Sequence, residues 1–215
     1  MDKMDKKVSL ALIKRLPRYY RFLGDLLDNG ITRISSKDLS QKMNVTASQI
    51  RQDLNTFGCF GQQGYGYNVE FLLEEIKAIL GLNKTYNLVI LGAGKIGQAL
   101  LNYANFEKRG FNFIGIFDIN EKIIGNDIRG LTVNHIDNLE QFIQQNQVDI
   151  VVLAVPGTNA YDLYKTVVKC GIKAIWNFSN TELKLKEGVV VENVHLTDSL
   201  MTLVYRFNSD DMLDD

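Results

Sequence analysis

The sequence NLVILGAGKIG occupies residues 87–97 and decides the fold of the second part of the chain. An apolar segment, 87–91, runs directly into a loop with three glycines and then into a helical stretch, 96–108. In a dinucleotide-binding strand–loop–helix unit the first glycine makes the turn, the second lets the backbone approach a pyrophosphate, and the third lets helix and strand pack closely. The candidate cofactor-binding residues of this loop are Gly92, Ala93, Gly94, Lys95, Ile96 and Gly97.

A second apolar segment, 111–117, ends in Asp118, twenty-one residues after Gly97. At the end of the second strand of such a unit, a carboxylate hydrogen-bonds the ribose 2′-OH and repels a 2′-phosphate. This spacing favours NAD(H) over NADP(H) as the ligand. The competing interpretation makes Asp118 an ordinary turn residue.

Continuous apolar runs at 149–155, 172–178 and 189–194 alternate with helical stretches, which predicts an α/β fold with a parallel sheet buried on both faces. Ligands bind such sheets at the carboxyl ends of the strands. We expect Trp176 in the core. The residues expected near a nicotinamide or an equivalent group are Val155, Pro156, Gly157, Asn177 and Phe178.

The first eighty residues predict a helix-turn-helix followed by a wing. Apolar residues recur every three or four positions from 9 to 28, and Pro17 predicts a break between a short helix and a second one over 17–28. Helices are expected at 37–43, at 47–56 behind a capping box, and at 69–80. Between the last two, the glycine- and aromatic-rich segment 59–67 is typical of a hairpin.

Charge supports a DNA-binding role for this region. Residues 1–58 hold eleven Lys and Arg against six Asp and Glu, whereas 59–215 hold thirteen against nineteen. A basic segment with Arg, Gln and Asn on one helix suits phosphates and base edges in a major groove. A small helical module that binds protein is the competing interpretation. The candidate DNA contacts are Lys14, Arg15, Arg18, Tyr19, Arg21, Thr46, Ser48, Gln49, Arg51, Gln52, Asn55, Gly64 and Tyr65.

Length and composition exclude several classes of protein. The 215 residues, 46% hydrophobic and 23% charged, fit one large or two small globular domains. The apolar runs are too short for a membrane helix and the first residues lack the apolar core of a signal peptide, so we expect a cytoplasmic protein. Two cysteines and two histidines distant in sequence predict neither a disulfide framework nor a metal site.

Three function classes fit these patterns: a nucleotide-sensing DNA-binding regulator, a minimal NAD-dependent enzyme, and a CoA- or other nucleotide-binding module with a helical protein-interaction domain. Hydride transfer needs a general acid or base and a second domain to hold substrate, and no residues remain to build that domain. The loop 154–157 resembles loops of CoA-binding domains, whereas Asp118 argues against CoA. We therefore expect a regulator, not an enzyme.

The segments KRLPRYYR at 14–21 and GYGYNV at 64–69, with the glycine loop and FDIN at 117–120, resemble the Rex family of redox-sensing transcriptional repressors over nearly the whole chain. The resemblance implies a homodimer that binds an inverted-repeat DNA operator through two winged helices. It implies release by NADH, competition by NAD+, and exchange of the C-terminal helix between subunits. It also implies that Tyr103 lies near the nicotinamide.

On this basis we expect a winged-helix DNA-binding domain over 1–81, a Rossmann-like NAD(H)-binding domain over 82–196 and a dimerisation helix within 197–215. One position departs from the family pattern. Several members have an acidic residue before the C-terminal helix that engages the arginine matching Arg15, and this chain has His195 there, with Asp198 three residues on. We expect one of these two residues to couple to Arg15. A protonated His195 would make the switch pH-sensitive, and a structural cap is the simpler role for this histidine.

Overall fold

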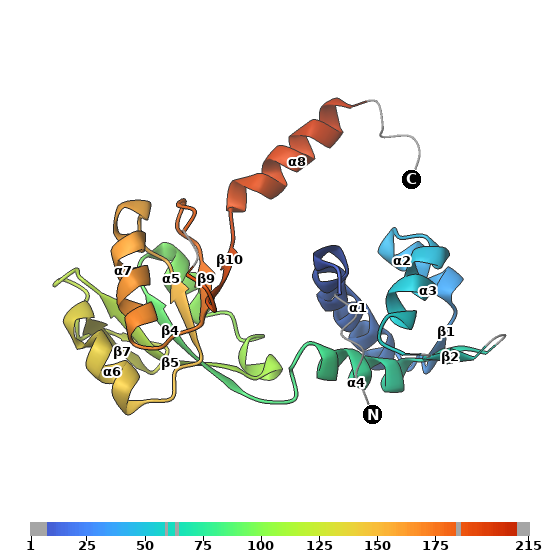
Figure 1. Ribbon diagram of the computed structural model, residues 1–215, viewed down its shortest axis with the longest axis horizontal. Helices are drawn as coiled ribbons and strands as arrows, with labels where there is room; N and C mark the ends of the chain where they lie inside the picture. Colours follow the sequence, from blue (N-terminus) through green and yellow to red (C-terminus); the bar gives the residue numbers. More distant parts are fainter. Residues whose placement is uncertain (1–7, 59, 63–64, 184–185, 210–215) are drawn as a thin grey trace. The chain divides into compact units, whose positions relative to one another are not determined.

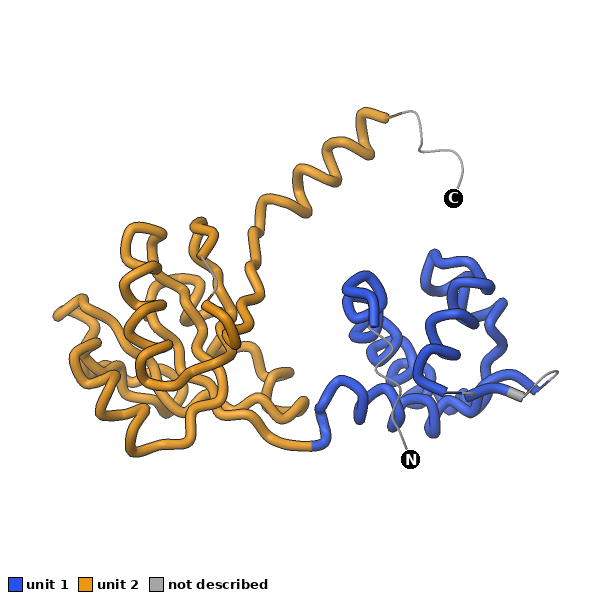
Figure 2. Tube along the Cα trace, in the orientation of Figure 1, with its two compact units in different colours: residues 1–83, 215 blue, residues 84–214 orange. Residues whose placement is uncertain are grey.

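The computed structural model describes residues 8–58, 60–62, 65–183 and 186–209. These form two compact units, one ending at Asn83 and the other beginning at Lys84 (Figure 2). Each has its own hydrophobic core, because the buried residues of the first unit form one cluster and those of the second form two others.

Within its described residues, the first unit contains four helices and a small antiparallel sheet (Figure 1). The polar residues before the helices explain where each one begins: Ser9, Ser35, Thr46 and Asn68 each accept a hydrogen bond from the backbone N–H three residues on. The sheet order is β1-β3-β2. The elements are α1 (Leu10–Asp28), β1 (Arg33–Ile34), α2 (Ser36–Met43), α3 (Ala47–Asn55), β2 (Gly61–Gln62), β3 (Gly66–Asn68) and α4 (Val69–Ile79).

Helix α1 is continuous through Pro17, so the predicted break at this residue is wrong. Pro17 is exposed, and the buried stripe of the helix passes on its other side through Leu12, Leu16, Tyr19, Leu23 and Leu26. An interior proline costs about 3 kcal/mol, whereas each fully buried apolar side chain contributes about 1.5–3 kcal/mol. Packing along the stripe therefore outweighs the lost hydrogen bond.

The wing is built on β2 and β3, with β1 as a third strand that was not predicted. Gly66 has φ +70°, and a Cβ there would lie 2.6 Å from the carbonyl oxygen of Ile34. Glycine is therefore required where β3 of the wing comes close to the backbone of β1. Gly64, one of the expected DNA contacts, lies outside the described residues.

The second unit is a seven-stranded sheet of order β10-β9-β8-β4-β5-β7-β6, parallel except for the β6–β7 pair. The strand order reverses between β4 and β8, which is the switch point where doubly wound sheets bind ligands. The strands are β4 (Tyr86–Leu91), β5 (Phe111–Asp118), β6 (Asp127–Ile128), β7 (Leu131–His135), β8 (Ile150–Leu153), β9 (Ala174–Asn177) and β10 (Val190–Asn193).

Helices cover the two faces of this sheet unequally. On one face α6 (Leu139–Gln145) and α7 (Gly157–Lys169) pack over the strands, whereas on the other the core contains Leu101 of α5 (Lys95–Leu101). Helix α5 is shorter than the predicted 96–108: it ends at Leu101, and a 3₁₀ turn, η1 (Glu107–Arg109), follows. Between them the chain turns so that Phe106 packs edge-on against Phe113 and Trp176.

The last helix, α8 (Leu196–Asn208), follows β10 and has no buried residue. It begins one residue before the range 197–215 in which the dimerisation helix was predicted. Large apolar side chains exposed on it are Leu196, Leu200, Met201, Leu203, Val204, Tyr205 and Phe207. A helix with this much exposed apolar surface is typical of an element that packs against another chain.

Candidate nucleotide site and DNA-binding face

The three glycines of the loop after β4 differ in what surrounds them. Gly92 has φ +104°, and a Cβ on it would overlap the carbonyl oxygen of Ala154. A Cβ on Gly97 would overlap the carbonyl oxygen of Gly92, so close packing of α5 on the loop requires glycine. Gly94 has no heavy atom within 4 Å of its Cβ position. The open side of the loop is therefore at Gly94, as expected where a pyrophosphate approaches the backbone.

Asp118, at the end of β5, is joined to the glycine loop by a direct hydrogen bond. Its Oδ2 accepts from the backbone N–H of Ala93 at 2.6 Å, and its Oδ1 accepts from those of Ile119 and Asn120 at 2.8 and 2.9 Å. A carboxylate has about four acceptor positions, so one is left for a ribose hydroxyl. Asp118 thus has a structural role in the loop in addition to the expected role toward the ligand.

A cavity of about 140 Å³ at the carboxyl ends of β4, β5 and β8 brings the glycine loop and Asp118 together. Of the residues expected there, Gly92, Gly94, Asp118, Val155 and Pro156 line it. The other residues that line it are mostly apolar: Phe117, Ile119, Ile136, Ala154 and Leu163, with Asn159. An apolar slot beside a single carboxylate has the chemistry that suits an adenine ring and its ribose.

The side chain of Asn177, a residue expected near the nicotinamide, is hydrogen-bonded within the protein. It is fully buried, and its amide donates to the Thr181 carbonyl at 2.9 Å and to Asn193 Oδ1 at 2.7 Å. Its Oδ1 accepts from the backbone N–H and the hydroxyl of Ser179. Asn177 therefore shapes the loop after β9. Sequence reasoning could place it at the strand end but could not reveal these internal partners.

An aromatic cluster occupies the sheet face that carries α5. The ring of Phe106 lies 5.2 Å from that of Tyr103 and 5.6 Å from that of Trp176, and Trp176 lies 4.6 Å from Phe178. Tyr103 and Phe178 do not line the 140 Å³ cavity, but they end this cluster, with Tyr103 55% exposed.

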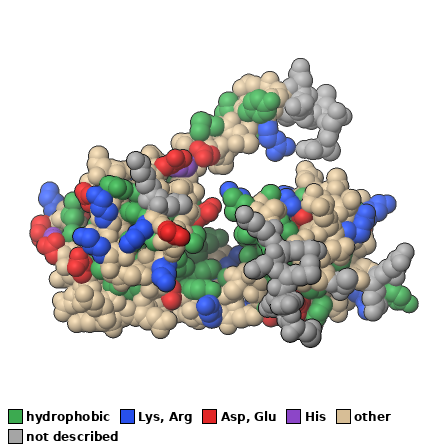
Figure 3. All heavy atoms as spheres, viewed as in Figure 1, with side chains coloured by type: hydrophobic (Ala, Val, Ile, Leu, Met, Phe, Trp, Pro, Cys, Tyr) green, Lys and Arg blue, Asp and Glu red, His purple; other side chains and the backbone are tan. Residues whose placement is uncertain are grey.

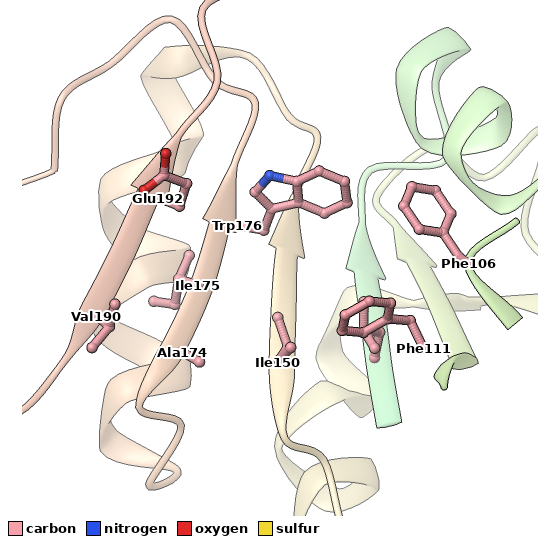
Figure 4. A pocket seen from close by; sticks show the side chains of 9 residues that line it. Phe106, Phe111, Ile150, Ala174, Ile175, Trp176, Val190 and Glu192 are labelled. Carbon is pink, nitrogen blue, oxygen red and sulfur yellow. The ribbon is translucent and has the colours of Figure 1, made fainter. Parts of the chain in front are cut away.

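Next to the cluster, an apolar cavity of about 350 Å³ opens over strands β10, β9, β8, β4 and β5 (Figure 4). Trp176, expected in the core, is only partly buried and lines it together with Phe111 and Ile150. Glu192 is the charged residue among its lining side chains. No pattern in the sequence predicted this cavity, because it arises where helices leave part of the sheet uncovered.

The second helix of the helix-turn-helix, α3, presents the predicted polar face. Ser48, Arg51, Gln52 and Asn55 are exposed and surround a shallow depression. Arg51 Nη1 donates to the hydroxyl of Ser36 at 3.0 Å, which holds its guanidinium near the start of α2. Thr46 caps α3 by accepting from the backbone N–H of Gln49 at 3.1 Å.

Further basic side chains lie on α1. Lys14 and Arg21 are exposed on α1, and the Arg18 guanidinium lies 5.8 Å from the ring of Phe22. Tyr65, on the wing, is 69% exposed. In the view of Figure 3, most of the acidic side chains lie over the second unit, in agreement with the charge asymmetry of the sequence.

Two expected DNA contacts, Arg15 and Tyr19, instead point into the first unit. Arg15 forms two hydrogen bonds of 2.7 Å with the carboxylate of Asp53, and the hydroxyl of Tyr19 donates to the same carboxylate at 3.0 Å. Tyr19 is fully buried, so its assignment as a DNA contact is wrong: the stripe of α1 that carries it faces the core. Asp53 was not expected to have any role.

These contacts change the titration of the groups involved. Burial alone would raise the pKa of Asp53, but hydrogen bonds from Arg15, Gln49 and Tyr19, with the charge of Arg15, together lower it. The pKa of Tyr19 is raised, first by burial and then by the neighbouring carboxylate. Asp53 is therefore ionised and Tyr19 neutral at physiological pH.

Comparison with known proteins identifies the family. Residues 83–181 match a model described as CoA binding domain, and residues 7–55 match one described as putative DNA-binding protein N-terminus. The redox-sensing transcriptional repressor Rex of Thermoanaerobacter pseudethanolicus is 57% identical over 96% of this chain and 92% of its own length. That of Clostridium novyi is 55% identical over 95% and 99%. The chain belongs to the Rex family.

Solved structures of another Rex-family repressor, RSP, agree over the same length. The complex of RSP with β-NAD+ and operator DNA has a TM-score of 0.90 at 55% identity, covering 97% of this chain and 96% of that one. The complex of RSP with β-NADH has a TM-score of 0.89 at 52% identity. The protein is thus a redox-sensing transcriptional repressor with a winged-helix domain followed by a Rossmann-like domain, which confirms the expected fold and functional class.

The expected departure from the Rex pattern lies at the start of α8. His195 precedes the helix but its side chain makes no capping hydrogen bond, so the expectation of a simple structural cap is wrong. Asp198 is exposed in the first turn. Coupling of either residue to Arg15 stays a prediction, and in this structure the guanidinium of Arg15 is already paired with Asp53.

Two general expectations can be compared with the described part of the chain. Within it, no cluster of three or more His, Cys, Asp or Glu side chains could hold a metal ion. No helix described here has the length and apolar character needed to cross a membrane.

Proposed function

We propose that this Rex-family repressor binds NAD(H) with the adenosine in the 140 Å³ cavity and the pyrophosphate against Gly94. The observation that carries the proposal is the arrangement of Gly92, Gly94 and Asp118 around one cavity at the switch point of the sheet. The remaining acceptor position on Asp118 suits a ribose hydroxyl, and its charge repels the 2′-phosphate of NADPH. RSP, in complex with β-NADH and with β-NAD+, supports this choice of ligand.

In this proposal the nicotinamide lies toward the aromatic cluster that ends in Tyr103 and Phe178. The same carboxyl edge of the sheet carries both the cavity and the end of β9. Lys95 and Ile96 begin α5, and Gly157 begins α7, so their backbone N–H groups are available to the phosphates and the amide of the ligand.

The second part of the proposal concerns DNA. We infer that α3 enters the major groove of an inverted-repeat operator, with Arg51, Gln52 and Asn55 toward base edges and Lys14, Arg18 and Arg21 toward phosphates. These side chains have the donor patterns that read guanine and adenine, and RSP, in complex with operator DNA, supports the assignment. Tyr65 on the wing would contact the adjacent backbone.

A homodimer completes the proposed repressor. Its two α3 helices would occupy successive major grooves, about 34–36 Å apart. The exposed apolar side chains of α8 support pairing with a second copy, in which this helix is exchanged between subunits. NADH would release the operator because it binds unequally to the two arrangements of the dimer, and NAD+ would compete with it.

We further propose that the protein regulates without catalysing a reaction. The sheet and its helices account for the described residues of the second unit, so a substrate domain like that of a dehydrogenase has no counterpart among them. His135, at the end of β7, lies beside a carboxylate: its Nδ1 is 3.2 Å from Oδ2 of Asp137. The full-length likeness to repressors supports the same conclusion and disfavours an independent CoA-binding module.

Substitution of Asp118 tests the ligand site. Asp118→Ala should weaken NADH binding at least about tenfold and reduce discrimination against NADPH, because it removes the ribose acceptor, the repulsive charge and the acceptor for the backbone N–H of Ala93. Binding is measured by the fluorescence of NADH and NADPH titrated with protein, while operator binding without nucleotide should persist.

The matched control is Glu121→Ala, which removes an exposed acid close by in the sequence. It should preserve NADH affinity and most of the preference over NADPH. If Asp118→Ala and Glu121→Ala both bind NADH as tightly as the unaltered protein, Asp118 does not contact the ligand.

A further inference from the structure

We propose that Arg15 and Asp53 form a positioning pair that sets the orientation of the recognition helix α3, and that Arg15 is not itself a DNA contact. The inference rests on the proposed role of α3 in operator binding. It reassigns an arginine of the basic segment from the DNA surface to a contact between α1 and α3, with 29% of its side chain exposed.

The carboxylate of Asp53 is at the centre of a closed hydrogen-bond network. Its Oδ2 accepts from Arg15 Nε at 2.7 Å and from the Tyr19 hydroxyl at 3.0 Å. Its Oδ1 accepts from Arg15 Nη2 at 2.7 Å and from Gln49 Nε2 at 2.8 Å. The Asp53 side chain is only 2% exposed, so both oxygens depend on these four donors.

The network joins two helices that are distant in sequence. Arg15 and Tyr19 lie one turn apart on α1, whereas Gln49 and Asp53 lie one turn apart on α3. The guanidinium is planar and meets the carboxylate through two parallel hydrogen bonds, which fixes direction as well as distance. Rotation of α3 about its axis would break this fork.

The exposed face of α3 depends on that rotation. At about 100° per residue, Arg51 and Asn55 each lie about 200° from Asp53, on the opposite side of the helix. The buried side is completed by Ile50 and Leu54. Holding Asp53 therefore aims Arg51 and Asn55 outward. It also keeps the Gln49 amide on Asp53, which withdraws Gln49 from the predicted base contacts.

Arg15→Lys separates positioning from direct contact, because it keeps the positive charge but loses the planar fork. If Arg15 positions α3, the ratio of affinities for operator and scrambled duplex should fall about tenfold or more, with an unchanged salt slope on scrambled DNA. The comparison is Lys14→Gln on the exposed side of α1, which should lower the salt slope and preserve the ratio.

Asp53→Asn provides the second arm. If Asp53 belongs to a positioning pair, this variant should lower the ratio of affinities for operator and scrambled duplex as Arg15→Lys does. The double variant should then lower that ratio little more than either single variant. If Arg15 instead contacts phosphate, Arg15→Lys should bind as the unaltered protein does, and Asp53→Asn should strengthen binding to both duplexes. Additive losses or a retained ratio would overturn the proposal.

Hydrogen exchange of the DNA-free protein gives a readout that does not involve DNA. Arg15→Lys should accelerate exchange of backbone amides over 47–55 while leaving those of the second unit unchanged; unaltered exchange there would overturn the positioning role. Failure of the unaltered protein to distinguish the two duplexes would contradict operator binding itself, and the exchange result would still decide whether Arg15 holds α3.

Discussion

At the scale of single residues, the glycine loop contains two positions that differ sharply in what they can accommodate. Gly94→Ala should fold as stably as the unaltered protein, because its Cβ meets open space, but should lose at least about tenfold in NADH affinity where the pyrophosphate approaches. Gly97→Ala should lose about 1–3 kcal/mol of stability, because its Cβ overlaps the Gly92 carbonyl.

Thermal unfolding followed by circular dichroism and titration with NADH measure both effects. The pair forms its own control, since the same atoms are added in each variant. Equal destabilisation by the two substitutions would contradict the different environments of Gly94 and Gly97.

Asp53 provides a residue-scale prediction about pH. Its pKa is lowered in the folded protein, whereas in the unfolded chain it is about 3.9. Its contribution to stability is therefore complete above the unfolded value and is lost as the pH falls through the lower, folded value. Near neutral pH, Asp53→Asn should cost about 3 kcal/mol, because it disrupts a buried ion pair.

Urea unfolding of the first unit, followed by far-UV circular dichroism, measures this cost from pH 7 down to pH 3. The difference between Asp53→Asn and the unaltered protein should shrink below about pH 3.9. A cost that stayed constant across this range would mean that the charge of Asp53 does not carry the contribution.

At the scale of elements, α3 and α1 are predicted to contribute differently to DNA binding. Arg51→Ala should lower discrimination between operator and mutated operator by about 1–3 kcal/mol, because a guanidinium fork reads a base edge. Lys14→Ala should weaken binding to all sequences alike and reduce the salt slope by about one. Fluorescence polarisation with operator and mutated operator at several salt concentrations distinguishes the two variants. Identical behaviour of Arg51→Ala and Lys14→Ala would contradict the division into base and phosphate contacts.

Sequence periodicity and capping residues were sufficient to predict most elements. The capping box marked the start of α3, and the glycine loop marked the β4–α5 unit, because these features act locally. The predictions failed where distant packing decides the outcome. Helix α1 continues through Pro17 because its buried stripe packs along its whole length, and α5 ends early because Phe106 turns into an aromatic cluster.

The candidate sites show the same division. The pattern of glycines and acid placed Gly92, Gly94 and Asp118 correctly around one cavity, since local geometry dictates their spacing. Neither the burial of Tyr19 nor the internal partners of Asn177 could be inferred, because each depends on side chains elsewhere in the fold. Asp53 carried no local feature that separates a buried acceptor from an ordinary helix residue.

At the scale of the whole molecule, regulation requires that ligand binding in one unit affects DNA binding in the other. A nucleotide site alone senses NADH and a winged helix alone binds DNA, but a redox-sensing repressor must bind ligand and operator with unequal affinity in its two arrangements. By linkage, the factor by which NADH weakens operator binding equals the factor by which operator weakens NADH binding. A coupling of about 1–3 kcal/mol corresponds to a change of about 5- to 150-fold.

The most direct test of this coupling is fluorescence polarisation of a labelled inverted-repeat operator, bound by the full-length protein at fixed salt and titrated with nucleotides. We predict release by NADH, opposition of that release by NAD+, and little effect of NADPH or CoA at the same concentrations. Operator binding that is indifferent to NADH over a range where the protein demonstrably binds it would contradict the account.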